Sequence, residues 1–141
     1  MKVIVGCVIA ATLSVSSVIF ASTHYNPPER ISCTLDNAHQ LICQGFDHQY
    51  LVEDTDTSNL KDMNNEVFDF AVGKAYLSPT QDSSTIFFTY KNAQFPSIKL
   101  RTVIPTTLPD FANGDWKKIS DDIYTCDTSY MQCPFINFSG K

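Results

Sequence analysis

The chain has 141 residues, and its 15 acidic side chains outnumber its 10 basic ones, so the formal charge at pH 7 is −5. An acidic protein repels a phosphate backbone, which argues against nucleic acid as a partner. The length suits one domain, and we expect the negative charge to serve solubility.

Residues 1–21 have the layout of a secretory signal peptide. Lys2 precedes an apolar run, and Ala21 is the small residue before a cleavage site at Ser22. The alternative is a retained membrane anchor, but spanning needs about 20 predominantly apolar residues, and several Ser and Thr residues interrupt this run. We therefore predict that residues 22–141 form a single β domain in the periplasm or outside the cell, without a membrane span.

An even number of cysteines remains once the leader and its Cys7 are removed: Cys33, Cys43, Cys126 and Cys133. In an exported chain such a set predicts two disulfides, for which three pairings exist. Neither pair has the short spacing of a zinc site or of a Cys-x-x-Cys redox motif.

The segments "ISCTL" and "LICQG" flank the polar stretch "DNAHQ", which predicts a hairpin. If Leu35 faces Leu41, then Cys33 faces Cys43 on the same apolar face. Opposed residues of an antiparallel pair lie about 4.5–5.5 Å apart at Cα, within reach of a disulfide. This register predicts the Cys33–Cys43 bridge.

The last two cysteines end a six-residue loop between "DIYTC" and "CPFINF". If Cys126 faces Cys133, then Tyr124 faces Phe135. We therefore predict a terminal hairpin closed by a Cys126–Cys133 bridge.

The middle of the chain alternates apolar and polar residues with the period of a β-strand. In residues 67–77 the pattern places Phe68, Phe70 and Val72 on one face and predicts a bulge at Gly73. Beyond the bulge, alternate residues should return to the same face.

Residues 85–90 and 98–104 predict a strand pair with Phe88 opposite Leu100 and Tyr90 opposite Ile98. Its other face would carry Phe87, Thr89, Lys99 and Arg101. Prolines make residues 105–118 irregular. Six or seven strands with short turns predict an all-β fold, a small antiparallel sandwich or barrel with two short-loop disulfides.

One acidic loop invites comparison with a calcium-binding loop, because Asp54, Asp56, Ser58 and Asp62 supply oxygens at suitable spacing. However, Asn59 stands where that loop needs glycine, and no glutamate occupies its last position. We expect a solvated acidic loop, and neither a metal nor another cofactor.

Three histidines are the obvious candidates for catalysis: His24, His39 and His48. His48 lies beside Asp47, but neighbours on a strand point to opposite faces. The sequence has no nucleophile elbow or phosphate-binding loop. We assign no catalytic residue; a small hydrolase with a site built from His48 and the acidic loop is the alternative.

Aromatic and apolar residues in loops are candidate partner contacts: Phe95, Trp116, Tyr130 and Met131. Phe95 and Trp116 could instead fold over the core, and Lys91, Lys99 and Arg101 could form a small basic patch or a plain solvated face. The leading hypothesis is a non-catalytic exported binding protein for a protein or envelope component, and a structural or assembly component of the envelope is a further alternative. Asn137 begins a glycosylation sequon, which matters only in a host that glycosylates exported chains.

Overall fold

Eleven antiparallel strands and a short 3₁₀ helix make up the described part of the chain. The computed structural model describes residues 23–53, 57–58, 60–104 and 106–138. The strands are β1 (Thr23–Tyr25), β2 (Arg30–Leu35), β3 (Leu41–Gln44), β4 (Tyr50–Val52), β5 (Glu66–Leu77), β6 (Ser84–Lys91), β7 (Ile98–Thr102), β8 (Thr107–Pro109), β9 (Lys117–Ser120), β10 (Ile123–Cys126) and β11 (Phe135–Asn137), with the helix η3 at Tyr130–Gln132. The predicted all-β, antiparallel class is confirmed, and the sheet does not close on itself.

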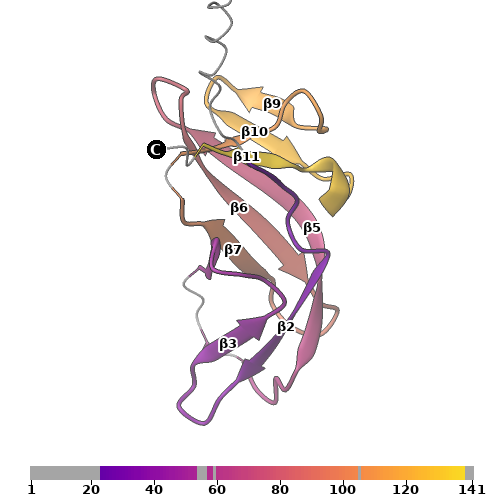
Figure 1. Ribbon diagram of the computed structural model, residues 1–141. Coiled ribbons are helices and arrows are strands. Elements are labelled where there is room, and N and C mark those ends of the chain that lie inside the picture. Colours follow the sequence, from indigo (N-terminus) through magenta and orange to yellow (C-terminus); the bar gives the residue numbers. More distant parts are fainter. Residues whose placement is uncertain (1–22, 54–56, 59, 105, 139–141) are drawn as a thin grey trace, which may run out of the picture.

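The long hairpin of β5 and β6 runs the length of the molecule and carries the other strands (Figure 1). The first half of β5 pairs with β2, and its second half pairs with β10. In the same way β6 pairs mainly with β7 and, at its beginning, with β8. The sheet therefore has two ends that share only the central hairpin.

A β-bulge in the middle of β5 separates these two halves. The register with β6 shifts between Phe70 and Val72, so the extra residue is Ala71 and not Gly73 as predicted. Phe70 packs against the core, and after the bulge the core face continues with Gly73 and Ala75. The prediction that Val72 shares the face of Phe68 was wrong, because the extra residue turns Val72 to the opposite face.

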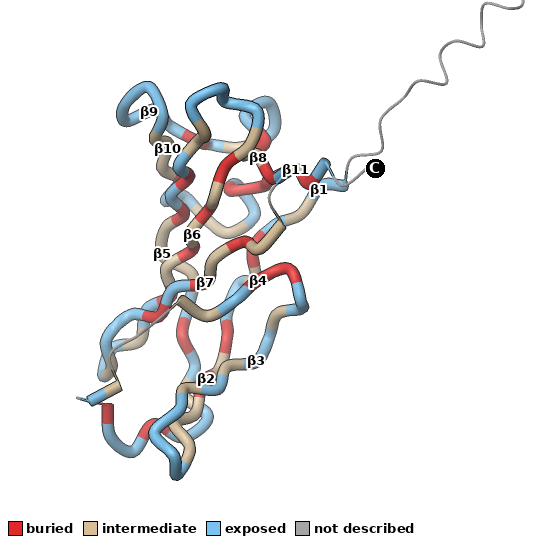
Figure 2. Tube along the Cα trace, turned by 90° about the vertical axis from the view of Figure 1, so that its left-hand side faces the viewer, coloured by how far each residue is buried: buried red, intermediate tan, exposed pale blue. Residues whose placement is uncertain are grey.

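The core lies on the inner face of β5 and β6, where buried residues alternate with more exposed ones (Figure 2). Ile86, Phe88 and Tyr90 of β6 are fully buried, as the alternation predicted. The ring of Phe88 packs against Tyr50 and Phe135, with centroids 6.3 and 5.7 Å away. Aromatic contacts therefore join strands that are distant in sequence.

The two predicted local pairings are confirmed. Cys33 pairs with Cys43 and Leu35 with Leu41 in β2 and β3, and the Cys33–Cys43 disulfide is present. Phe88 pairs with Leu100 between β6 and β7. Short connections let the apolar alternation alone determine both registers.

The predicted terminal hairpin does not form, although the Cys126–Cys133 disulfide does. β10 pairs with β5 and β9, and β11 pairs with β8 and β1. Between them, η3 turns the chain away, and the backbone carbonyl of Gln132 accepts a hydrogen bond from the amide of Asp115 (2.8 Å). The bridge therefore joins segments that no ladder of hydrogen bonds connects directly.

The strand count exceeds the predicted six or seven because four strands of three or four residues were not expected. β8 and β9 form within residues 105–118, which we predicted to be irregular. β1 forms in the lead-in, and β4 makes a separate strand that pairs with β7. Short strands at the margin of a sheet depend on their neighbours more than on their own composition.

The proline-containing lead-in between β1 and β2 is fastened to the core by two phenols. The Tyr90 hydroxyl donates a hydrogen bond to the carbonyl of Pro28 (2.7 Å), and the Tyr50 hydroxyl donates to that of Asn26 (3.3 Å). The predicted signal peptide lies outside the described residues. Among those that are described, no helix is long and apolar enough to cross a bilayer.

Candidate functional site

The outer face of β5, β6 and β7 is hollowed into an open groove of about 480 Å³. Its lining comes from alternate residues of the three strands and from the residue after β4: Val72, Lys74, Tyr76, Phe87, Thr89, Lys99 and Glu53. We call this set the outer groove. These side chains face away from the core because their strand neighbours, such as Phe88 and Leu100, face into it.

The strand register arranges the groove in two rows. In one row Lys74 lies opposite Phe87, which lies opposite Arg101 at the rim of the groove. In the other row Val72 lies opposite Thr89, which lies opposite Lys99. The apolar side chains of Val72, Tyr76 and Phe87 thus form the floor of the groove. Lys74 lies on β5 at one side of this floor, and Lys99 lies on β7 at the other.

The floor is held in place by contacts between its own members. The rings of Tyr76 and Phe87 meet edge to face, with centroids 5.7 Å apart. Edge-to-face geometry is favourable for an aromatic pair, and Tyr76 still has 42% of its surface exposed, so the pair offers apolar surface to a ligand.

The groove carries more positive than negative charge, whereas the whole chain is acidic. Arg101 donates from Nε to Oε1 of Glu53 at 3.4 Å, so these two charges largely offset each other. Over the residues that the structure describes, neither Lys74 nor Lys99 forms an ion pair within 4.0 Å. Two exposed ammonium groups therefore remain to meet an anionic ligand.

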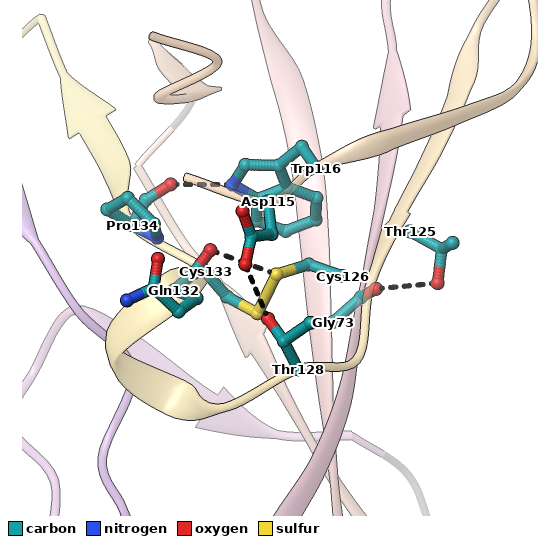
Figure 3. Close-up of a disulfide and its surroundings, with 9 residues drawn as sticks. All are labelled: Gly73, Asp115, Trp116, Thr125, Cys126, Thr128, Gln132, Cys133 and Pro134. Atoms are coloured by element: carbon teal, nitrogen blue, oxygen red, sulfur yellow. Dashed lines mark hydrogen bonds between the residues drawn. A yellow bond between two sulfur atoms is a disulfide. The ribbon is translucent and has the colours of Figure 1, made fainter. Parts of the chain in front are cut away.

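Trp116, one of the predicted partner contacts, lies in the core with 9% of its surface exposed. Its indole Nε1 donates a hydrogen bond to the carbonyl of Pro134 (2.8 Å), beside the Cys126–Cys133 bridge (Figure 3). Phe95 is half-buried and packs against Phe68, with ring centroids 6.4 Å apart. For both aromatics, the structure shows the packed position that the sequence had left as an alternative.

Tyr130 and Met131, the other two predicted contacts, lie on η3. Met131 has 59% of its surface exposed, whereas Tyr130 is half-buried and borders a separate hollow with Arg30 and Asp69. The four predicted contacts are therefore not gathered into one surface, and none of them lines the outer groove.

Within the described residues, His24 has a carboxylate partner in Asp110. Its Nδ1 lies 3.1 Å from Oδ2 of Asp110, which is only 3% exposed and accepts further hydrogen bonds from the backbone and side-chain amides of Asn113. Burial alone would raise the pKa of Asp110, but the hydrogen bonds from Asn113 and His24 outweigh it, so the pKa lies below its usual value. His39 and His48 are exposed.

The acidic loop can be followed only in part. Asp54 and Asp56 lie outside the described residues, while Ser58 and Asp62 are exposed. Across the described ranges, no group of three or more His, Cys, Asp and Glu side chains is placed to hold a metal ion.

Sequence reasoning found half of the outer groove and missed the other half. It placed Phe87, Thr89 and Lys99 together on an outward face, and the register confirms this. It missed the contribution of β5 because the bulge was placed at Gly73, which assigned Val72 to the core. The apolar residues Val72 and Tyr76, which lie on the same side of β5 as Lys74, were the available signal.

Comparison with protein-family models, with curated proteins and with solved structures found no match.

Proposed function

We propose that this chain is an exported, non-catalytic binding protein that recognises a protein or an envelope component through the outer groove. The observation that carries the proposal is the combination of an apolar floor on an open sheet face with two exposed lysines that form no ion pair among the described residues. Aromatic surface provides contact area at low entropic cost, and the lysines add orientation and selectivity.

The two disulfides support the exported location, because such bridges persist in oxidising compartments. This agrees with the signal peptide predicted for residues 1–21. The class of site supports binding over hydrolysis, since the groove lining offers two hydroxyls, those of Tyr76 and Thr89, and the lining places no histidine beside either of them.

The proposal can be tested by comparing which host components the protein retains. We would immobilise the wild-type protein, the groove variant Lys74→Glu/Lys99→Glu and the matched variant Lys61→Glu/Lys117→Glu, whose exposed lysines lie outside the groove lining. Each would be incubated with the exported fraction of the native host and analysed by quantitative mass spectrometry.

We expect at least one host component to be retained by the wild-type protein and the matched variant and lost from the groove variant. Equal retention by all three proteins, or retention by none, would contradict binding through the outer groove. Because all four lysines are exposed, circular dichroism should show the same fold in each protein.

A further inference from the structure

We propose that the ligand of the outer groove is an extended, acidic segment of a partner protein, in which two carboxylates flank an apolar side chain. This inference rests on the proposed function and adds the chemical class of the partner. It is drawn from the charges, the spacing and the open shape of the groove.

The charges favour an anionic partner. Lys74 and Lys99 are exposed on opposite sides of the floor, and the neighbouring Arg101 is already engaged by Glu53. On a chain with a formal charge of −5, this local excess of cations orients an acidic segment toward the groove and away from the rest of the surface.

The spacing favours an extended peptide. Lys74 and Lys99 are two strands and one row apart, which places their Cα atoms about 12 Å from each other in a regular sheet. In an extended peptide, side chains four residues apart lie on the same side at about 13 Å, and the side chain midway between them shares that side. A Glu-x-Leu-x-Glu segment would thus place its carboxylates near the lysines and its leucine over Phe87 and Thr89.

The shape of the groove disfavours a fatty acid or anionic lipid, which is the other kind of ligand that combines a negative charge with an apolar part. Pockets for small apolar ligands bury most of the ligand surface, usually 70–90% or more. The outer groove is an open face built from three adjacent strands and the residue after β4, so it can cover one side of a ligand only. One-sided contact suits a segment that remains part of a larger protein.

Peptide titrations followed by NMR would test this proposal. The ¹⁵N-labelled protein, produced by export so that its disulfides form, would be titrated with acetyl-Glu-Ser-Leu-Ser-Glu-amide. The matched peptide acetyl-Gln-Ser-Leu-Ser-Gln-amide keeps the shape and removes the charges. Vesicles of phosphatidylglycerol and phosphatidylcholine would serve as the lipid probe.

We expect the amide signals of Val72, Phe87 and Thr89 to shift with the acidic peptide, and its affinity to exceed that of the glutamine peptide by about fivefold, as for two exposed ion pairs. The Lys74→Glu/Lys99→Glu variant should lose this preference, while Lys61→Glu/Lys117→Glu should keep it.

Equal affinity for the two peptides, or shifts in the groove caused only by vesicles, would overturn the acidic-segment proposal. So would the absence of any shift with the acidic peptide. If the host component were still lost from the groove variant in the retention experiment, binding through the groove would stand and only the assigned ligand class would fail.

Discussion

The indole of Trp116 lies directly against the backbone of Gly73: a Cβ atom at residue 73 would be 3.1 Å from Cη2 of the indole. The ring of Phe88 would be equally close. Both rings are buried, and the hydrogen bond to Pro134 restrains the indole, so neither can move aside freely. We expect Gly73→Ala to lower the free energy of unfolding by about 1–3 kcal/mol, measured by urea denaturation.

The same substitution in a Trp116→Phe background tests whether the indole causes this loss of stability. Trp116→Phe removes the part of the indole nearest Gly73, so the additional cost of Gly73→Ala should be smaller in that variant. If the alanine substitution were neutral in both backgrounds, close packing at Gly73 would not be the reason for a glycine there.

The two disulfides should differ in their contribution to stability. Both close short loops, for which the chain-entropy estimate is about 2.5–3 kcal/mol each. Cys126 and Cys133 are both fully buried, whereas Cys43 is half-buried on the marginal strand β3. Replacing Cys126 and Cys133 with alanine should therefore cost about 3–5 kcal/mol, and replacing Cys33 and Cys43 about 2–3 kcal/mol.

Urea denaturation of the two double variants would measure this difference. A larger loss from the Cys33–Cys43 variant would mean that the first hairpin, and not the packing beside Trp116, depends more on its bridge.

The buried carboxylate of Asp110 should make stability depend on acidity. Its pKa is lower in the folded protein than the usual value of about 3.9 in an unfolded chain. Its contribution is therefore present above about pH 4 and is lost as the pH falls further, because the unfolded chain then binds the proton more readily. We expect Asp110→Asn to cost about 1.5–3 kcal/mol at pH 7, as for hydrogen bonds to a charged group.

Denaturation curves between pH 2 and pH 7 would show the effect as a loss of stability toward acid that is weaker in Asp110→Asn. Asp82 provides a second test at an exposed site, since its pKa is also lowered, by hydrogen bonds from Thr80 and Ser78, and the same linkage predicts a weaker loss of stability toward acid in Asp82→Asn. Identical pH profiles for wild type and Asp110→Asn would contradict the assignment.

Two phenols should resist ionisation in the folded state. Burial raises the pKa of Tyr50, with smaller effects from Asp47 and Tyr25, and burial likewise raises that of Tyr90, with a smaller effect from Tyr50. Absorbance at 295 nm at pH 11 should be unchanged by Tyr50→Phe or Tyr90→Phe in the folded protein but reduced by each in denaturant. Since unfolded phenols ionise near pH 10, the free energy of unfolding should fall as the pH rises above that value.

The glycosylation sequon at Asn137 should not be used in the folded protein. Asn137 is 3% exposed and lies in β11 between β1 and β8, so an attached glycan would prevent both strands from pairing. Expressed in a glycosylating host, the folded monomer should carry no glycan by intact mass. The variant His39→Ser, which creates a sequon at the exposed Asn37, is the positive control.

How far the sequence predicts this structure depends on the distance between partners. Cys33 and Cys43, or Phe88 and Leu100, belong to strands joined by short connections, so apolar alternation was enough to predict their register. Cys126 and Cys133 are equally close in sequence, yet their strands pair with distant partners. Alternation identifies a strand's inward face but does not identify its neighbour.

The same limit applies to the outer groove. Phe87 and Lys99 could be placed on one face from a local pairing, but the part contributed by Lys74 and Val72 depended on where β5 bulges. A bulge adds one residue and exchanges the faces of all that follow, and here it coincides with the change of partner from β2 to β10. That change is a property of the assembled sheet.

The pairing of β1 with β11 means that the first and last strands of the described chain complete each other. During synthesis, which proceeds from the N-terminus, β1 has to wait for almost the entire chain before its partner exists. Until then the margin of β8 is also uncovered, because β11 lies between β8 and β1. The emerging chain therefore passes through a period in which the free edges of β1 and β8 are open to wrong pairing, and this period ends only when β11 has been made and lies between them.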